Sequence, residues 1–136
     1  MIHFTMNGMD VQAEEGSTVL DTARFYGLAI PTLCWMEGLT PWGGCRLCLV
    51  EIGVAPKSKL VSSCTYPVEE GLVVHTDTRR VIEARRMMIE LMLSTAPMSK
   101  TLQDLASKFY VTQQRFPPRN EECVYCGLCI RMCDEQ

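Results

Sequence analysis

The 136-residue sequence lacks several features that mark common protein classes. Its 13 lysines and arginines are scattered and are outnumbered by 16 acidic residues, so no basic stripe is available to neutralise phosphates, and we expect no nucleic-acid partner. No apolar run approaches the roughly 20 residues that span a bilayer, and the N-terminus has neither the cationic start nor the apolar core of a signal peptide. These absences predict a cytoplasmic protein with no direct membrane span.

The sequence also lacks the motifs of nucleotide chemistry and of covalent catalysis. It has no G-x-G-x-x-G pattern, no P-loop and no flavin fingerprint, and no convincing nucleophile–base pair. The only two histidines, His3 and His75, lie in predicted strands, far along the sequence from any cysteine, and we expect both to be structural. The chain is therefore predicted not to be an enzyme by itself.

Cysteine is abundant by contrast, with eight residues in two groups of four. The first group has the spacing C-x10-C-x2-C-x15-C and the second has C-x2-C-x2-C-x3-C, with 58 cysteine-free residues between them. The first group is Cys34, Cys45, Cys48 and Cys64; the second is Cys123, Cys126, Cys129 and Cys133. Two different thiolate patterns in one small chain predict two different iron–sulfur clusters, and hence an electron carrier.

Two other uses of these cysteines remain as alternatives. Disulfides are disfavoured in a reducing cytosol, where clustered cysteines more often bind metal. Structural zinc sites usually pair two short Cys knuckles per ion. The first group has only the knuckle at Cys45 and Cys48, and the second places three cysteines at i, i+3 and i+6, which suits a loop around a cubane. A zinc-bound structural module is therefore the weaker interpretation.

Hydrophobic periodicity predicts a small α+β sheet with one helix across it, within one domain or a small domain plus an appendage. The expected elements are a hairpin over 2–14, a helix opening with a Thr18–Asp21 capping box and closing at Gly27, and strands over 46–52, 60–61 and 72–74.

Two helices are expected after the sheet. The first covers 78–95, with Arg79, Arg80, Arg85 and Arg86 largely outside its apolar stripe. The second begins after Ala96-Pro97, with Thr101 and Asp104 as a capping box. An extended connector follows at 116–118. The predicted division is a ferredoxin-type domain over 1–77, a helical connector over 78–118 and a cluster-binding segment over 119–136.

The first cysteine group suits a [2Fe–2S] cluster, which needs four thiolates on two irons. One loop from Cys34 to Cys48 would supply three thiolates, and Cys64 arrives from a later segment. Glycines in the loop would let backbone N–H groups approach sulfur. The flanking residues have two interpretations each. Trp35 and Trp42 would limit solvent access or simply pack, and Arg46 would offset cluster charge or be solvated.

Residues 34–52 and 63–74, with their Cys-Trp-Met-Glu-Gly-Leu-Thr-Pro-Trp-Gly-Gly-Cys-Arg-Leu-Cys segment, resemble a specific [2Fe–2S] domain. It is the N-terminal region of the large iron–sulfur subunit of respiratory complex I, shared with iron-only hydrogenases, NAD-linked formate dehydrogenases and diaphorase subunits of NAD-reducing hydrogenases. The resemblance implies the β-grasp ferredoxin fold. It also implies that Cys34, Cys45, Cys48 and Cys64 are the ligands.

The sequence departs from that family after residue 95. Relatives carry a loop with one histidine and three cysteines that binds a [4Fe–4S] cluster, just before a Leu-Gln-Asp-Leu-Ala helix. Here the helix sequence is present at 102–106, but only 98–101 separates it from Ala96-Pro97, and no cysteine or histidine remains. We infer that this cluster loop is deleted.

The second cysteine group is a strong [4Fe–4S] signature, with Gly127 permitting the sharp turn between ligands. Cys123, Cys126 and Cys129 are the expected ligands. The role of Cys133 stays open, because the fourth cysteine of such a run can serve another cluster. Cys133 binds the same cluster, a partner subunit supplies the fourth ligand, or the site is incomplete.

The predicted function is an electron-transfer subunit that relays single electrons between a [2Fe–2S] and a [4Fe–4S] cluster in a larger oxidoreductase linked to NAD(P)H, hydrogen or formate. Its expected partners are a flavoprotein subunit that uses NAD(P)H and a catalytic subunit of the hydrogenase or formate dehydrogenase type. The alternative with the same clusters is a free soluble ferredoxin that shuttles electrons between enzymes.

Overall fold

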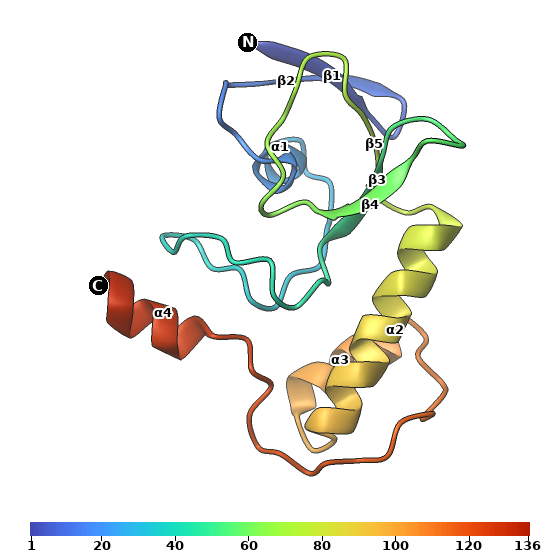
Figure 1. The fold of residues 1–136 in the computed structure, drawn as a ribbon, viewed down its shortest axis with the longest axis vertical. Coiled ribbons are helices and arrows are strands. Elements are labelled where there is room, and N and C mark those ends of the chain that lie inside the picture. Colours follow the sequence, from blue (N-terminus) through green and yellow to red (C-terminus); the bar gives the residue numbers. More distant parts are fainter.

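A computed structural model describes all residues, 1–136, and centres on a mixed five-stranded sheet (Figure 1). The strands lie in the order β2-β1-β5-β3-β4. Their bounds are β1 Ile2–Met6, β2 Met9–Ala13, β3 Leu49–Ile52, β4 Lys59–Ser62 and β5 Val73–His75. Strands β1 and β5 pair in parallel, and the other neighbours are antiparallel. The arrangement confirms the α+β class and agrees with the expected β-grasp ferredoxin fold.

The first half of the sheet forms where local signals predict it. Asn7 and Gly8 both have positive φ, 51° and 80°, which is the geometry of a two-residue hairpin turn that matches strand twist. Helix α1 (Val19–Phe25) has the predicted capping box, since Thr18 accepts from the Asp21 amide and Asp21 accepts from the Thr18 amide. Its Gly27 has the left-handed φ of 72° expected after a helix end.

The main core lies between α1 and the sheet and includes two of the candidate ligands. Fourteen buried residues form it, and Cys48 and Cys64 are among them. The expected strand over 46–52 begins only at Leu49. Arg46 adopts a φ of 60°, which breaks an extended strand and turns the chain into the cysteine loop. The candidate ligand Cys48 thus lies in the core, just before a central strand.

A pair of helices forms a second, smaller layer. Helix α2 (Arg79–Thr95) is capped by Thr78, and helix α3 (Lys100–Lys108) is capped by Ser99, whose hydroxyl accepts from the Leu102 amide. The predicted capping by Thr101 is therefore wrong by two residues. Ser99 is the residue with extended backbone angles before the helix, whereas Thr101 already lies inside the first turn.

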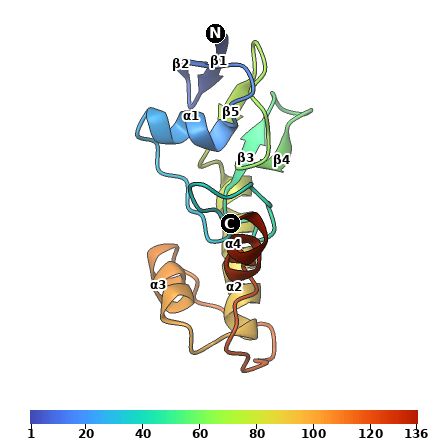
Figure 2. The same ribbon diagram turned by 90° about the vertical axis from the view of Figure 1, so that its left-hand side faces the viewer.

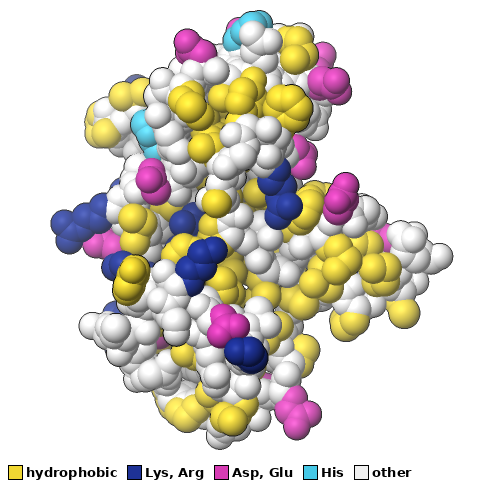
Figure 3. Space-filling view, turned by 180° about the vertical axis from the view of Figure 1, so that it is seen from behind, with side chains coloured by type: hydrophobic (Ala, Val, Ile, Leu, Met, Phe, Trp, Pro, Cys, Tyr) yellow, Lys and Arg dark blue, Asp and Glu magenta, His cyan; other side chains and the backbone are white.

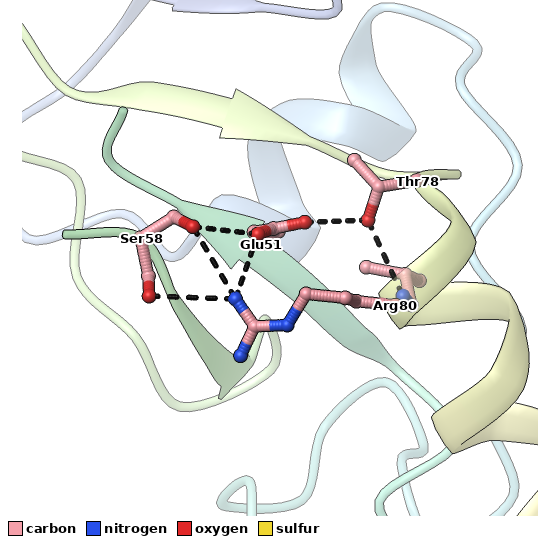
Figure 4. A network of polar contacts seen from close by, with 5 residues as sticks. Glu51, Ser58, Thr78 and Arg80 are labelled. Carbon is pink, nitrogen blue, oxygen red and sulfur yellow. Dashed lines mark hydrogen bonds and ion pairs between the residues drawn. The ribbon is translucent and has the colours of Figure 1, made fainter. Parts of the chain in front are cut away.

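A polar network ties α2 to the sheet (Figure 4). Glu51 on β3 accepts from the Ser58 and Thr78 hydroxyls, each at 2.6 Å, and from the Arg80 guanidinium at 2.9 Å. These donors, led by Ser58, hold the pKa of Glu51 below its ordinary value. Because Thr78 is also the N-cap of α2, the buried carboxylate fixes where the helix leaves the sheet.

The C-terminal part of the chain returns from the helix pair to the cysteine loop. Arg115 in the connector pairs with the buried Glu90 of α2 at 2.8 Å. Helix α4 (Leu128–Glu135), which the sequence did not predict, lies beside the loop before β3 in both ribbon views (Figures 1 and 2). None of the helices is both long enough and apolar enough to cross a membrane.

Candidate metal centres

The structure brings the four cysteines of the first group together at one end of the sheet. We call residues 34–48, between α1 and β3, the first cysteine loop; it carries three of them, and Cys64 follows β4. The Cys45 amide donates to the Cys34 sulfur at 3.5 Å, and the Cys48 and Cys64 thiols form a hydrogen bond. None is in a disulfide. Cys34, Cys48 and Cys64 are at most 2% exposed, whereas Cys45 is half-buried.

The thiol chemistry of this group suits ligation. The hydrogen bond from Cys64 lowers the pKa of Cys48 to about 6, and the same bond raises the pKa of Cys64. Burial raises the pKa of Cys45. Iron ligation requires thiolates, so a lowered pKa of the Cys48 thiol favours ligation.

The donor set fits an iron–sulfur cluster. All four donors are sulfur, which favours iron–sulfur clusters or zinc. A [2Fe–2S] cluster spreads four thiolates over two irons, in a site where water is limited.

Glycines give the loop its close packing. The amide that donates to a cysteine sulfur belongs to Cys45. Gly43 has a φ of 71°, and a Cβ there would lie 3.2 Å from the Thr65 side chain. A Cβ on Gly44 would lie 2.4 Å from the Trp42 ring. Each glycine therefore makes room for a neighbouring side chain.

The residues that flank the ligands take separate roles. Trp35 packs against the main core, with the Arg24 guanidinium 3.9 Å from its ring centroid. Trp42 is 53% exposed and lies over Gly44. Arg46 is exposed but donates to the Ser62 hydroxyl at 2.7 Å. The packing interpretation therefore fits Trp35, and Arg46 is tied to the end of β4.

Arg85 is the residue that the sequence reasoning missed. We expected it outside the apolar stripe of α2, yet it is 5% exposed and donates to the backbone carbonyls of Leu47 and Leu49, at 3.0 and 3.1 Å. These carbonyls flank Cys48. Arg85 lies four residues from both Val81 and Ile89, which are buried, so the helical spacing itself carried the signal. Burial lowers the pKa of Arg85, but arginine remains protonated at neutral pH.

The second cysteine group is arranged differently, along the connector and α4. We call residues 123–133 the second cysteine run. Cys123, Cys129 and Cys133 are exposed and Cys126 is half-buried, so the four thiols are not enclosed together. Gly127 has a φ of 73° and begins α4, which confirms the predicted turn. The Tyr125 amide donates to the Cys123 sulfur at 3.3 Å.

One further observation bears on whether this run suits a cluster. The Nε atom of Arg131 on α4 is buried and has no hydrogen-bond partner. It lies 3.7 Å from the place of a Cβ on Gly127, at the turn between Cys126 and Cys129. Because an unpaired buried donor is costly, an acceptor at this turn would stabilise the protein. The thiolate and sulfide sulfurs of a cluster are such acceptors.

Comparison with known proteins gives the family. A family model described as a 2Fe-2S iron-sulfur cluster binding domain matches residues 1–79. The chain is similar to the mitochondrial NADH-ubiquinone oxidoreductase 78 kDa subunit of Candida albicans, with 38% identity over 97 residues, which cover 71% of this chain and 13% of the relative. It is similar to the G subunit of the NADH-quinone oxidoreductase of Rickettsia bellii, with 31% identity over 160 residues, 99% of this chain and 23% of the relative.

Two further similarities extend this picture. The alpha subunit of the NADPH-Fe(3+) oxidoreductase of Geobacter sulfurreducens is 37% identical over 99 residues, 72% of this chain and 11% of the relative. A crystal structure of an NAD+-reducing [NiFe]-hydrogenase in the H2-reduced state matches with a TM-score of 0.84 and 27% identity, over 96% of this chain and 64% of that one. The chain spans a quarter or less of these curated relatives. From the family match, over more than half of its residues, the chain belongs to the 2Fe-2S iron-sulfur cluster binding domains.

Proposed function

We propose that the chain relays single electrons between a [2Fe–2S] cluster held by Cys34, Cys45, Cys48 and Cys64 and a [4Fe–4S] cluster held by the second cysteine run. The observation that carries the proposal is the meeting of four free thiols, three of them buried, at one end of a domain of the 2Fe-2S family. The chain has no catalytic role of its own in this proposal. It is one part of a larger oxidoreductase.

A [2Fe–2S] cluster supplies a site that accepts and gives up one electron. The protein's own groups set the conditions for that transfer. Three buried cysteines limit water, while the half-buried Cys45 lines an open cleft with Met88 and Tyr125. Arg85 places a buried positive charge behind Cys48, which favours the more negative, reduced state. We infer that electrons enter or leave at the Cys45 edge.

The second cysteine run is the proposed [4Fe–4S] site, with Cys123, Cys126, Cys129 and Cys133 as ligands. Cys129 and Cys133 are one turn apart on α4 and so lie on one face of the helix. Hydrophobic side chains gather on the projecting α4 arm, at the right of Figure 3, where Ile130 is 74% exposed. An exposed apolar surface around a candidate cluster site supports an embedded subunit rather than a free ferredoxin.

The similar proteins suggest the kind of assembly. Their names describe oxidoreductases of NADH with quinone, of NADPH with Fe(3+), and an NAD+-reducing hydrogenase. We propose a cytoplasmic complex with a flavoprotein that uses NAD(P)H and a catalytic subunit of the hydrogenase or formate dehydrogenase type. The alignment with the Rickettsia protein covers 160 positions, so at least 24 have no counterpart in this 136-residue chain. We infer that these positions include the loop whose loss the short 98–101 segment indicates.

The test is iron and acid-labile sulfide per chain on anaerobically purified protein, with low-temperature EPR after dithionite reduction. About six irons and two reduced signals are expected, two irons plus four. About two irons and one [2Fe–2S] signal would mean that the second cysteine run needs a ligand from a partner. A colourless protein with bound zinc would refute the proposal.

Cysteine variants separate the two sites. Cys48→Ala should remove the [2Fe–2S] signal and leave about four irons, whereas Cys126→Ala should leave about two irons and the [2Fe–2S] signal. Loss of both signals in either variant would contradict two independent sites.

A further inference from the structure

Polar contacts hold helix α4 against the first cysteine loop. None of its residues belongs to the buried core. Two of its charged residues, Arg131 and Glu135, are four residues apart and lie on the same face of the helix. Both contact Thr40, which is in the middle of the first cysteine loop.

Arg131 reaches both cysteine groups through backbone carbonyls. One of its terminal nitrogens donates to the Thr40 carbonyl at 2.9 Å. The other donates to the carbonyl of Cys34 and lies 3.5 Å from the carbonyl of Cys126. A single guanidinium thus links a cysteine of the first loop to a cysteine of the second run. The fork of donors in arginine suits such a bridge, and lysine cannot reproduce it.

Glu135 completes the contact from the next turn of α4. Its Oε1 atom accepts from the Thr40 amide at 2.9 Å and from the Thr40 hydroxyl at 2.5 Å. Helix α4 therefore binds every polar group of the exposed Thr40: its amide, its carbonyl and its hydroxyl. The contacting residues lie 91 to 95 positions further along the chain. Hydrogen bonds to charged groups are stronger than neutral ones.

Trp42 adds an aromatic contact between the two regions. The Arg131 guanidinium lies 5.7 Å from its ring centroid. A Cβ on Gly127 would lie 3.4 Å from the same ring, so the glycine turn of the second run approaches the indole closely. The ring of Trp42 is thereby close to both Gly44 of the first loop and Gly127 of the second run.

We propose that Arg131 and Glu135 form a clasp on Thr40 that holds the second cysteine run at a fixed place beside the first cysteine loop. The purpose of the clasp rests on the proposed function: it would keep two clusters close enough for electron transfer within one chain. The contacts themselves do not depend on that function. Arg131 and Glu135 are positioning residues and not ligands. Their removal should release α4 without removing iron.

Hydrogen–deuterium exchange on the anaerobically purified full chain tests the clasp directly. In Arg131→Ala and in Glu135→Gln, peptides covering 36–44 and 128–136 should exchange about ten- to a hundredfold faster, the effect of losing hydrogen bonds to a charged group. Arg119→Ala is the matched control, because this exposed arginine of the same terminal stretch pairs only with Glu121, at 3.6 Å. Unchanged exchange in both clasp variants would overturn the proposal.

EPR of the fully reduced protein tests the purpose of the clasp. Two paramagnetic clusters at a fixed short separation broaden or split each other's signals, so the wild type should show this interaction and Arg131→Ala should lose it at unchanged iron content. Narrow, independent signals in a wild type with six irons would overturn the coupling and leave the proposed function standing. A wild type with two irons would mean that the second cysteine run needs a partner's ligand, and the exchange experiment would then decide the clasp alone.

Discussion

Replacement of Arg85 by glutamine should make the reduction potential of the [2Fe–2S] cluster more negative. Arg85 is 5% exposed, and its guanidinium donates to the carbonyls on both sides of Cys48. Reduction adds one negative charge to the cluster, which a nearby cation stabilises. Removal of that cation therefore disfavours the reduced form and lowers the potential.

The magnitude follows from Coulomb's law. A unit charge acting over about 10 Å through an effective dielectric of about 20 contributes about 1.7 kcal/mol. For a one-electron couple this corresponds to about 70 mV. Because Arg85 is buried, the shift should persist at high salt, whereas surface charges are screened within about 10 Å at 0.1 M ionic strength.

The assay is an EPR-monitored redox titration with two companion variants. Arg85→Lys keeps the charge and should shift the potential much less than Arg85→Gln. Arg86→Gln removes an exposed charge from the next position of α2, whose Nε donates to the Phe109 carbonyl, and should have little effect. A potential within about 10 mV of wild type in Arg85→Gln, against the roughly 70 mV expected, or an equal shift in Arg85→Lys, would refute the electrostatic reasoning.

Three further predictions concern the support of the sites. Leu47→Ala removes a fully buried side chain that packs with Ile89, and should lower the free energy of unfolding in urea titrations by about 3–4 kcal/mol. If the effects of Leu47→Ala and Ile89→Ala were additive in a double-mutant cycle, the contact between the two side chains would be contradicted. Gly43→Ala should lower the free energy of unfolding by about 1–2 kcal/mol, because Gly43 has a φ of 71°, and should also lower the [2Fe–2S] content. Gly71→Ala is the control: Gly71 has a φ of 75° but no neighbour near its Cβ position, so this variant should lose stability without losing iron. Glu51→Gln should destabilise the protein at pH 7. Its neighbours lower the pKa of Glu51 in the folded state, so this contribution is complete above the unfolded pKa of about 4.3 and is lost as pH falls through the folded pKa. The difference in urea midpoint between wild type and variant should therefore be constant above about pH 5 and shrink as pH falls below about 4.

Local signals in the sequence were sufficient for the first half of the fold. The Asn7-Gly8 turn, the capping box at Thr18 and the helix after Thr78 are formed as predicted, because each depends on residues within four positions of one another. The capping of α3 was misassigned because Ser99 and Thr101 carry the same kind of side chain, and only the path of the chain decides which comes before the first turn. Helix α4 was missed because its eight residues bury nothing of their own.

The sequence by itself determined the candidate chemistry: two cysteine groups of different spacing and a family pattern around the first group. Those properties depend on residue type and spacing, which the chain carries with it. Tertiary structure alone decided that Cys34, Cys48 and Cys64 are buried while Cys45 is accessible, that Arg85 stands behind the ligands, and that α4 lies on the first loop. Each of these is a contact between segments tens of residues apart, whose energy is gained only when the sheet, the helix pair and the terminal helix have come together.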